Sequence, residues 1–245
     1  LNKKQESDLL IEISKILEDF LVNLFGIESD NKKLQQKHYD LAIIYKIKRN
    51  FVQRVVAKEL KEQIDDFDGF RFLQDKKITG DIDEIELKLA QKIDKSAEED
   101  LEILKKYSAW ALYSDKGKKF HRNGALFILP QKIDYQNLIN PSKIEQTIDP
   151  SNRGFNLTDQ GYNLNRNLSE ANYCIFCHKQ EKDSCRKGVL NQEQSQSCKT
   201  NPLGIDLHGC PLDEKISEMN LLKSQGFSIA ALAMAIIDNP MIIGI

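Results

Sequence analysis

Glycine and proline are scarce in this chain, with 12 and 6 residues among 245. This scarcity excludes a collagen-like fibre and a proline-rich disordered chain. Long apolar runs are also missing: Ile229–Ile237 has nine residues, whereas a membrane-spanning helix needs about 20. Neither sign of charge dominates, because 35 basic side chains stand against 37 acidic ones. The composition therefore predicts no membrane partner and no nucleic-acid partner.

Sequence motifs for nucleotide binding and catalysis are missing as well. The glycines never take the G-x-G-x-x-G spacing that holds a dinucleotide, and the chain has no Walker loop, no G-x-S-x-G elbow and no H-E-x-x-H helix. We expect no catalytic residue and no site for FAD or NAD(P)H in this chain. The polar start, Leu1–Glu6, is unlike a signal peptide, which favours a soluble cytoplasmic protein. The apolar end, Met241–Ile245, together with a first residue other than Met, suggests a fragment of something longer.

Apolar side chains recur every three or four residues over most of residues 1–113, which predicts an N-terminal helical bundle. Its charges are spread as on solvated helix faces. The expected helices cover residues 7–25, 30–61, 81–92 and 96–113.

Local signals predict the helix ends. Gly26 is placed as a C-cap, Asp30 as an N-cap, and Ser96 with Glu99 as a capping box. His38 and His121 have no cysteine or carboxylate pattern beside them, so we expect ordinary polar residues there.

Residues 114–168 lack periodicity and contain turn signals, which predicts an irregular connector that packs on the bundle. Within it, Gly124–Pro130 is a short apolar run that fits either one strand or a buried extended segment.

The third region, residues 169–245, contains all five cysteines, with the spacing Cys174-x2-Cys177-x7-Cys185-x12-Cys198-x11-Cys210. In a cytoplasmic protein, clustered thiols more often bind metal or act in redox chemistry than form disulfides. A tight turn within C-x2-C points two sulfur atoms the same way. We also expect Cys210 and Pro211 to open a helix that ends at Gly226, and a second helix over residues 228–237.

A family resemblance rests on these residues. Gly209–Leu212, Ala231-Leu232, Asn239-Pro240 and the motif Cys174–His178 resemble the N-terminal iron–sulfur region of the glutamate synthase small subunit and dihydropyrimidine dehydrogenase. The chain is more closely similar to large bacterial FAD-dependent pyridine nucleotide-disulfide oxidoreductases, which carry this region after a helical extension. The resemblance covers about residues 170–240 and is weaker before them.

The resemblance implies an α-helical ferredoxin-like domain after the bundle, holding [4Fe–4S] clusters for electron transfer. It assigns Cys174, Cys177 and Cys185 as the first three ligands of a motif and Cys210 as the fourth. It also implies that FAD and NAD(P)H bind only in downstream domains, so the partner is a downstream flavin domain or a partner subunit. The chain would then be part of an oxidoreductase and not catalytic alone.

Two departures from the family leave the expected site incomplete. The gap between Cys185 and Cys210 is 24 residues long instead of three, and no second cysteine motif follows. The chain could therefore hold at most one four-cysteine cluster. We expect Cys198 to be a spare thiol in an inserted loop, and His178 and His208 to lie outside the ligand set.

Two alternatives to an iron–sulfur site remain open on the sequence. Cys174, Cys177 and Cys185 with either Cys210 or His208 also match a structural zinc site of a protein-interaction scaffold, and the long gap suits zinc. The other alternative is that the cysteine region binds nothing.

Overall fold

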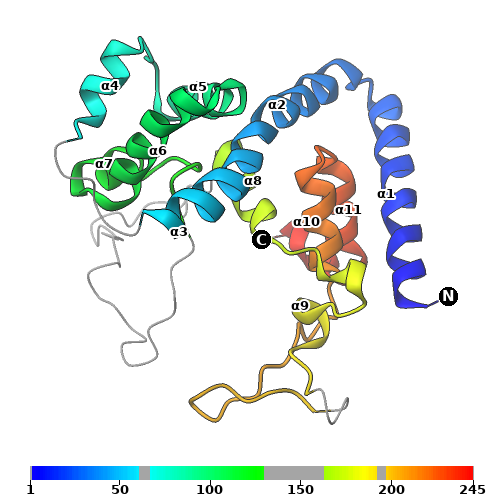
Figure 1. Cartoon of the computed structure of the whole chain (residues 1–245). Coiled ribbons are helices and arrows are strands. Elements are labelled where there is room, and N and C mark those ends of the chain that lie inside the picture. Colours follow the sequence, from blue (N-terminus) through cyan, green and yellow to red (C-terminus); the bar gives the residue numbers. More distant parts are fainter. Residues whose placement is uncertain (1, 61–66, 130–162, 192–196, 245) are drawn as a thin grey trace, which may run out of the picture.

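The computed structural model describes residues 2–60, 67–129, 163–191 and 197–244, and this part of the chain is mainly α-helical (Figure 1). Two isolated bridges are its only β-type pairings, so the described residues form no strand. The mainly α class is confirmed. The helices are α1 Lys3–Phe25, α2 Glu28–Ile47, the π-helix η1 Lys48–Val56, α3 Ala57–Glu59, α4 Gly69–Asp75, α5 Ile82–Lys95, α6 Glu98–Tyr113, α7 Asp115–Phe120, α8 Leu164–Tyr173, the 3-10 helix η3 Cys177–Gln180, α9 Ser184–Lys187, α10 Ile216–Ser224, α11 Ser228–Asp238 and the 3-10 helix η4 Pro240–Gly244.

The larger hydrophobic core lies among α2, η1, α4, α5 and α6, on the left of Figure 1. Tyr107 of α6 is fully buried at its centre, with ring centroids 5.0 Å from Phe72 and 5.5 Å from Trp110. Gly69 allows α4 to lie against Trp110, because a Cβ there would come within 2.3 Å of the indole ring. Helix α4, which lies outside the helices expected from the sequence, therefore completes the core.

A buried polar network stabilises this core. Glu86 of α5 accepts hydrogen bonds from the backbone N–H groups of Ala125 (2.6 Å) and Leu126 (2.7 Å), and its other oxygen contacts His121 Nδ1 at 2.9 Å. His121 Nε2 lies 2.9 Å from the Tyr107 hydroxyl. The sequence shows no carboxylate beside His121, because Glu86 is 35 positions away and only the fold brings it near.

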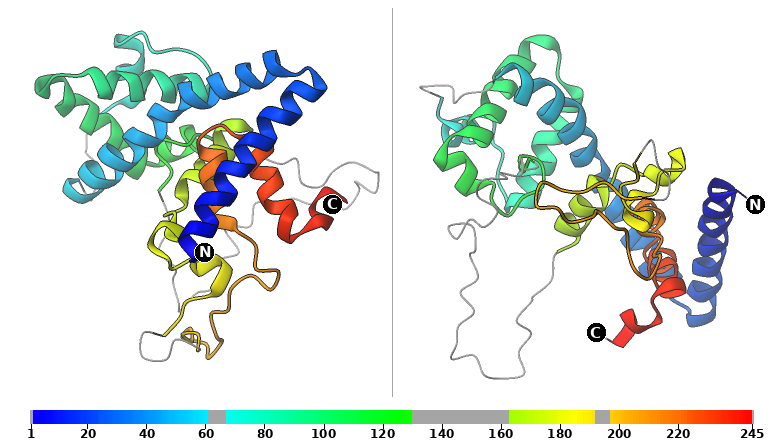
Figure 2. Two further views of the ribbon diagram at one scale, coloured as in Figure 1. Left: turned by 90° about the vertical axis from the view of Figure 1, so that its right-hand side faces the viewer. Right: turned by 90° about the horizontal axis from the view of Figure 1, so that it is seen from below.

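Helix α1 belongs to a second, smaller core with α10 and α11 (Figure 2). Ile11 packs there with Leu222 and Met234. The apolar face of α1 thus packs on helices of the third region and not within the expected bundle of residues 1–113. Glu18 of α1 is fully buried and accepts a 2.9 Å hydrogen bond from the N–H of Ala230, in the first turn of α11. A carboxylate is favourable at this position because the free N–H groups and the helix dipole are positive there.

Helix α1 also has a second apolar face, which no described residue covers. Its members are Leu9, Ile13, Ile16, Phe20 and Leu24, each about half exposed or more. None of the described helices is both long and apolar enough to cross a bilayer.

The observed helix ends confirm some local signals and correct others. Gly26 ends α1 in the left-handed conformation, as expected, and Asp81 caps α5 by accepting from the N–H of Glu84. The Asp30 cap is wrong, because α2 begins two residues earlier, after Ile27. The capping box is also wrong: Ala97 precedes α6, and the Ser96 hydroxyl donates instead to the Lys92 carbonyl.

Part of the expected connector is structured. It contains α7 and the start of α8, and Ala125, Leu126 and Phe127 are buried in the larger core without forming a strand. The expectation for residues 130–162 lies outside the described part of the chain.

Candidate functional site

The first two cysteines form a turn at the end of α8. Cys174 is the C-cap residue of that helix, and its sulfur accepts a hydrogen bond from the N–H of Phe176 at 3.4 Å. Cys177 begins η3, is 5% exposed, and accepts from the N–H of Ser184, also at 3.4 Å. Backbone N–H donors stabilise negative charge on sulfur, and bonds of this kind tune iron–sulfur sites.

Cys185 lies close to this pair. Burial raises the pKa of its thiol, and the neighbouring Cys177 and Cys174 thiols and the Asp183 carboxylate raise the pKa further. Three of the four predicted ligands are therefore within electrostatic reach of one another.

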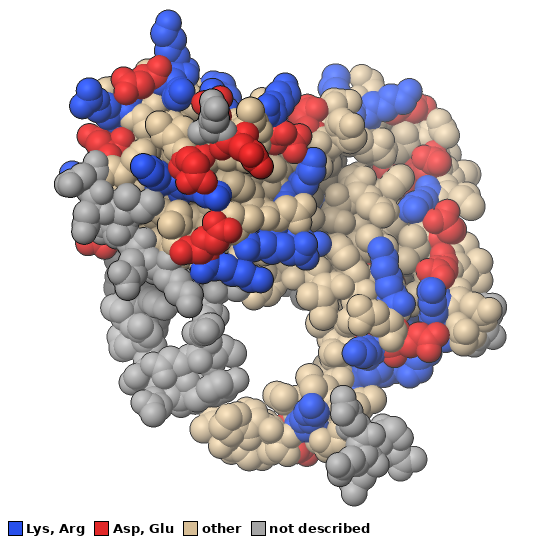
Figure 3. Space-filling view, in the orientation of Figure 1, with Lys and Arg blue, Asp and Glu red and all other residues tan. Residues whose placement is uncertain are grey.

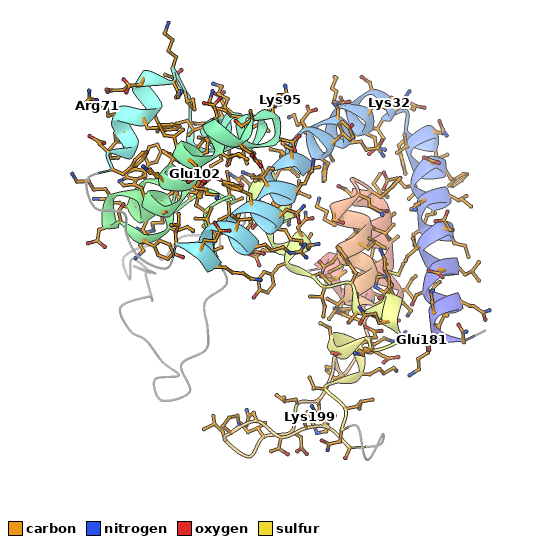
Figure 4. All side chains as sticks on the ribbon, in the orientation of Figure 1. Lys32, Arg71, Lys95, Glu102, Glu181 and Lys199 are labelled. Carbon is orange, nitrogen blue, oxygen red and sulfur yellow. The ribbon has the colours of Figure 1, made fainter. Side chains whose placement is uncertain are left out.

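The fourth predicted ligand, Cys210, is brought back to Cys185 by an arm. Residues 189–191 leave the site and residues 197–208 return to it, and the N–H of Cys210 then donates to the Cys185 carbonyl at 2.9 Å. Gly209 makes this approach possible, since a Cβ there would come within 2.2 Å of the Arg186 carbonyl oxygen. The 24-residue gap thus closes to a direct backbone contact. The arm itself extends away from the helices, with Lys199 on it (Figure 4).

Cys198 lies in this arm. It pairs with Leu190 in an isolated bridge, and its sulfur lies at the base of the arm, 2.9 Å from the position that a Cβ on Gly188 would take. Its role as a spare thiol stays a prediction. All five cysteines are free of disulfides.

The two histidines beside the cysteines differ completely in environment. His208 is on the arm with a side chain 75% exposed and lies 3.8 Å from Asp206. His178 is 3% exposed, and its Nδ1 lies 2.6 Å from the hydroxyl of Ser217, which also contacts the Cys174 sulfur at 3.8 Å. Burial lowers the pKa of His178, which favours the neutral imidazole.

Buried polar atoms gather around the cysteines. Glu218 of α10 is fully buried, and one of its oxygens accepts from the Ser7 hydroxyl of α1 at 2.5 Å. Its other oxygen, His178 Nε2, Asp183 Oδ1 and Arg186 Nε are buried without a hydrogen-bond partner in the described structure. Such atoms are costly, so their concentration here marks this corner as more than packing.

Strained backbone points to the same corner. Among the described residues, five positions other than glycine have a positive φ. Four of them lie beside the cysteines: Phe176 (51°), Glu181 (58°), Asp183 (38°) and Asp213 (60°). Conformations of this kind persist where the surrounding structure enforces them, and they concentrate at functional sites.

Asp213 ties the Cys210 corner to the Cys185 turn. It accepts from Arg186 at 2.8 Å and also pairs with Lys187, and these cations lower the pKa of its carboxyl to about 2. The turn from Cys210 does not itself open a helix: α10 begins at Ile216, and Lys215 before it pairs with Asp238 of α11 at 2.9 Å. The helix expected to begin at Pro211 is thus displaced by five residues.

The Asp213 clamp predicts a pH dependence. A depressed folded-state pKa contributes stability above the unfolded value near 4, and this contribution is lost as the pH falls toward 2. Asp213→Asn should therefore lower the free energy of unfolding by up to about 1 kcal/mol at pH 7, because the side chain is partly exposed to solvent. Urea titrations should show this difference at pH 7 and no difference near pH 2. A difference that persists unchanged to pH 2 would contradict the charge pairing, and Asp75→Asn, on exposed α4, is the control.

No three Cys, His, Asp or Glu side chains of the described residues are arranged to hold one metal ion. In a tetrahedral zinc site, four ligand atoms each lie about 2.0–2.3 Å from one ion, so these atoms lie close to one another. The cysteine ligands of an iron–sulfur cluster surround a larger group, so their sulfur atoms stand farther apart.

Sequence reasoning missed the polar support of this corner. Ser217 and Glu218 precede Leu221 and Leu222 by the helical spacing of three to five residues, so Glu218 occupies the buried stripe of α10. A carboxylate in an apolar stripe was the available signal. Nothing local indicated Asp183 or Asp213, whose partners are set by the tertiary structure.

The described residues form a mainly α-helical protein in which Cys174, Cys177 and Cys185 lie near one another and the backbone of Cys210 is bonded to that of Cys185. The chain is 35% identical over 238 residues, covering 89% of it and 81% of the other protein, to the uncharacterized protein RP005 of Rickettsia prowazekii (strain Madrid E). The chain therefore belongs to the same family as that protein. No family model and no solved structure matches it.

Proposed function

We propose that the corner formed by Cys174, Cys177, Cys185 and Cys210 is an iron–sulfur site for electron transfer. The observation that carries this proposal is the 2.9 Å backbone bond between Cys210 and Cys185, which brings these two stretches of backbone together despite the long gap. The resemblance to the N-terminal region of flavin-dependent oxidoreductases supports the same assignment. The protein would then supply the iron–sulfur part of an α-helical ferredoxin-like domain, with FAD and NAD(P)H held by a downstream domain or a partner subunit.

The residues present fit such a group. The sulfur atoms of Cys174 and Cys177 each accept a backbone N–H bond, which stabilises the thiolate over the thiol. A [4Fe–4S] cluster, when bound, supplies one-electron transfer.

The chain's own residues would keep the site rigid. Ser217 links the Cys174 sulfur to buried His178, and Asp213 holds the Cys210 corner on Arg186. Helix α10 packs against η3 and α9 and covers one side of the corner, where Cys177 is buried, whereas Cys185 is exposed. Lower water access and N–H bonds to sulfur are the means by which a protein sets a cluster potential.

Anaerobic reconstitution of the 245-residue chain with iron and sulfide tests the proposal. We expect a brown product with about four iron atoms per chain and a broad visible absorbance. Cys177→Ser should reduce retained iron at least tenfold, because serine offers no soft sulfur ligand. Cys198→Ser is the matched control and should retain iron as the unaltered chain does.

Two outcomes would overturn the assignment. A colourless product without iron would leave the corner as structural only. Stoichiometric zinc in the protein as purified, with no uptake of iron, would favour a structural zinc module instead. The C-x2-C turn with N–H bonds to sulfur suits zinc too, and metal analysis separates the two cases.

A further inference from the structure

A cavity of about 520 Å³ lies beside the cysteine corner, between η1 and α8. Its walls include Lys48, Arg49 and Arg54 from η1 and the segment Tyr173–Phe176 that leads into the cysteine turn. In Figure 3, Lys and Arg side chains lie near the middle of the molecule, above the central opening. Its volume falls in the range typical of small-molecule sites, about 300–1,000 Å³.

The three cations of this cavity have neutral partners. Lys48 Nζ donates to the Ser169 hydroxyl at 3.1 Å, Arg49 to the Asn172 carbonyl at 3.0 Å, and Arg54 to the Asn50 side chain at 3.4 Å. None of them forms an ion pair with a described residue, and the lining contains no carboxylate. Burial lowers the pKa of Lys48, although the Glu86 and Glu170 carboxylates outside the lining act in the opposite direction. Three positive charges thus line one cavity, and no described residue of the lining is a carboxylate.

The π-helix explains why these cations share a face. In an α-helix Arg49 and Arg54, five positions apart, would point about 140° from each other. In η1 the backbone bonds run between residues five apart, which brings such residues near one face. Helices of this kind are rare and frequently occur at functional sites. The opposite wall contains the left-handed residue Phe176, so both walls carry unusual backbone.

We propose that this cavity binds a phosphate-bearing small molecule of nucleotide size. Its phosphate groups would contact Arg49, Arg54 and Lys48, whose guanidinium and ammonium donors suit phosphate oxygens. A flat ring would lie toward Tyr173, which is 62% exposed at the cavity wall. The cavity adjoins the proposed cluster site, because Cys174 lines it.

Calorimetric titration of the metal-free chain with ADP tests this proposal independently of iron binding. We expect measurable binding that weakens with added salt, since charge contacts carry it. Inorganic pyrophosphate should bind and compete with ADP, whereas adenosine should bind at least tenfold more weakly. The double variant Arg49→Ala/Arg54→Ala should lose at least tenfold in affinity, and Arg71→Ala, an exposed arginine on α4, should match the unaltered chain.

The proposal is overturned if ADP does not bind at millimolar concentration, or if the double variant binds ADP unchanged. It is also overturned if a single-stranded oligonucleotide binds through these arginines at least tenfold more tightly than ADP, because the site would then serve nucleic acid. Arg54→Glu, a single change at an exposed position, tests the same contact if the double variant misfolds, and should give the same loss. Circular dichroism of each variant checks that the helices are retained.

Discussion

Replacing Glu86 by Leu is expected to lower the free energy of unfolding by about 3–5 kcal/mol. Glu86 is fully buried and accepts from two backbone N–H groups, those of Ala125 and Leu126, while its other oxygen contacts His121. Leucine has similar bulk but no acceptor, so three buried donors would lose their partner at once. Each unpaired buried group costs about 1–3 kcal/mol.

Urea unfolding at pH 7, followed by circular dichroism, measures this loss. Glu84→Leu is the matched control on the same helix, because Glu84 is exposed and its ion pair with Lys88 is long, at 3.8 Å. We expect that control to change stability by about 0.5 kcal/mol or less. A loss below about 1 kcal/mol for Glu86→Leu would mean that the Gly124–Phe127 segment is held without the carboxylate.

Glu18→Leu should have the second-largest effect, a loss of about 2–4 kcal/mol. One Glu18 oxygen accepts from Asn31 (3.1 Å) and Gln35 (3.2 Å) of α2, and the other accepts from the N–H of Ala230 in α11. This single buried side chain therefore connects three helices and caps one of them. Its removal leaves both amides and one helix N–H without an acceptor.

The Glu18→Leu change should also loosen the structure locally, around Ala230 and Cys177, in addition to lowering the free energy of unfolding. Amide exchange at Ala230 should become faster, and the thiol of Cys177 should react faster with a labelling reagent, because α1 also carries the Ser7 bond to Glu218 beneath the cysteines. Glu12→Leu, on the same helix but 67% exposed and paired only with Lys15, is the control. Equal labelling rates in Glu18→Leu and the unaltered chain would contradict a role for α1 in supporting the site.

Much of the helical structure could be predicted from the sequence because its signal is local. The spacing of apolar residues located α1, α5, α6, α10 and α11, and the φ > 0 requirement after α1 located Gly26. The predicted N-caps of two helices were wrong. Ser96 donates back to the Lys92 carbonyl instead of capping α6, and α2 starts before Asp30. The π-helix was missed, because an α-helix and a π-helix share nearly the same apolar pattern.

The candidate site, too, could be predicted from the sequence only in part. Spacing alone singled out Cys174 and Cys177, since residues three apart meet through one turn. The return of Cys210 to Cys185 could not be read from the sequence, because an arm of any length can close if its ends pair. The supporting groups, Ser217, Glu218 and Asp213, depend on contacts between distant segments.

By itself the sequence determined where most of the longer helices form and where the thiols cluster, since periodicity and side-chain chemistry are properties of short segments. Only the tertiary structure decided which apolar face meets which, and so placed α1 against α10 and α11 instead of against the larger core. It also decided which buried carboxylate finds which donor, as Glu86 and Glu18 do. The physical reason is that burial is non-directional and many pairings satisfy it, whereas a buried charge tolerates only the arrangement that supplies its hydrogen bonds.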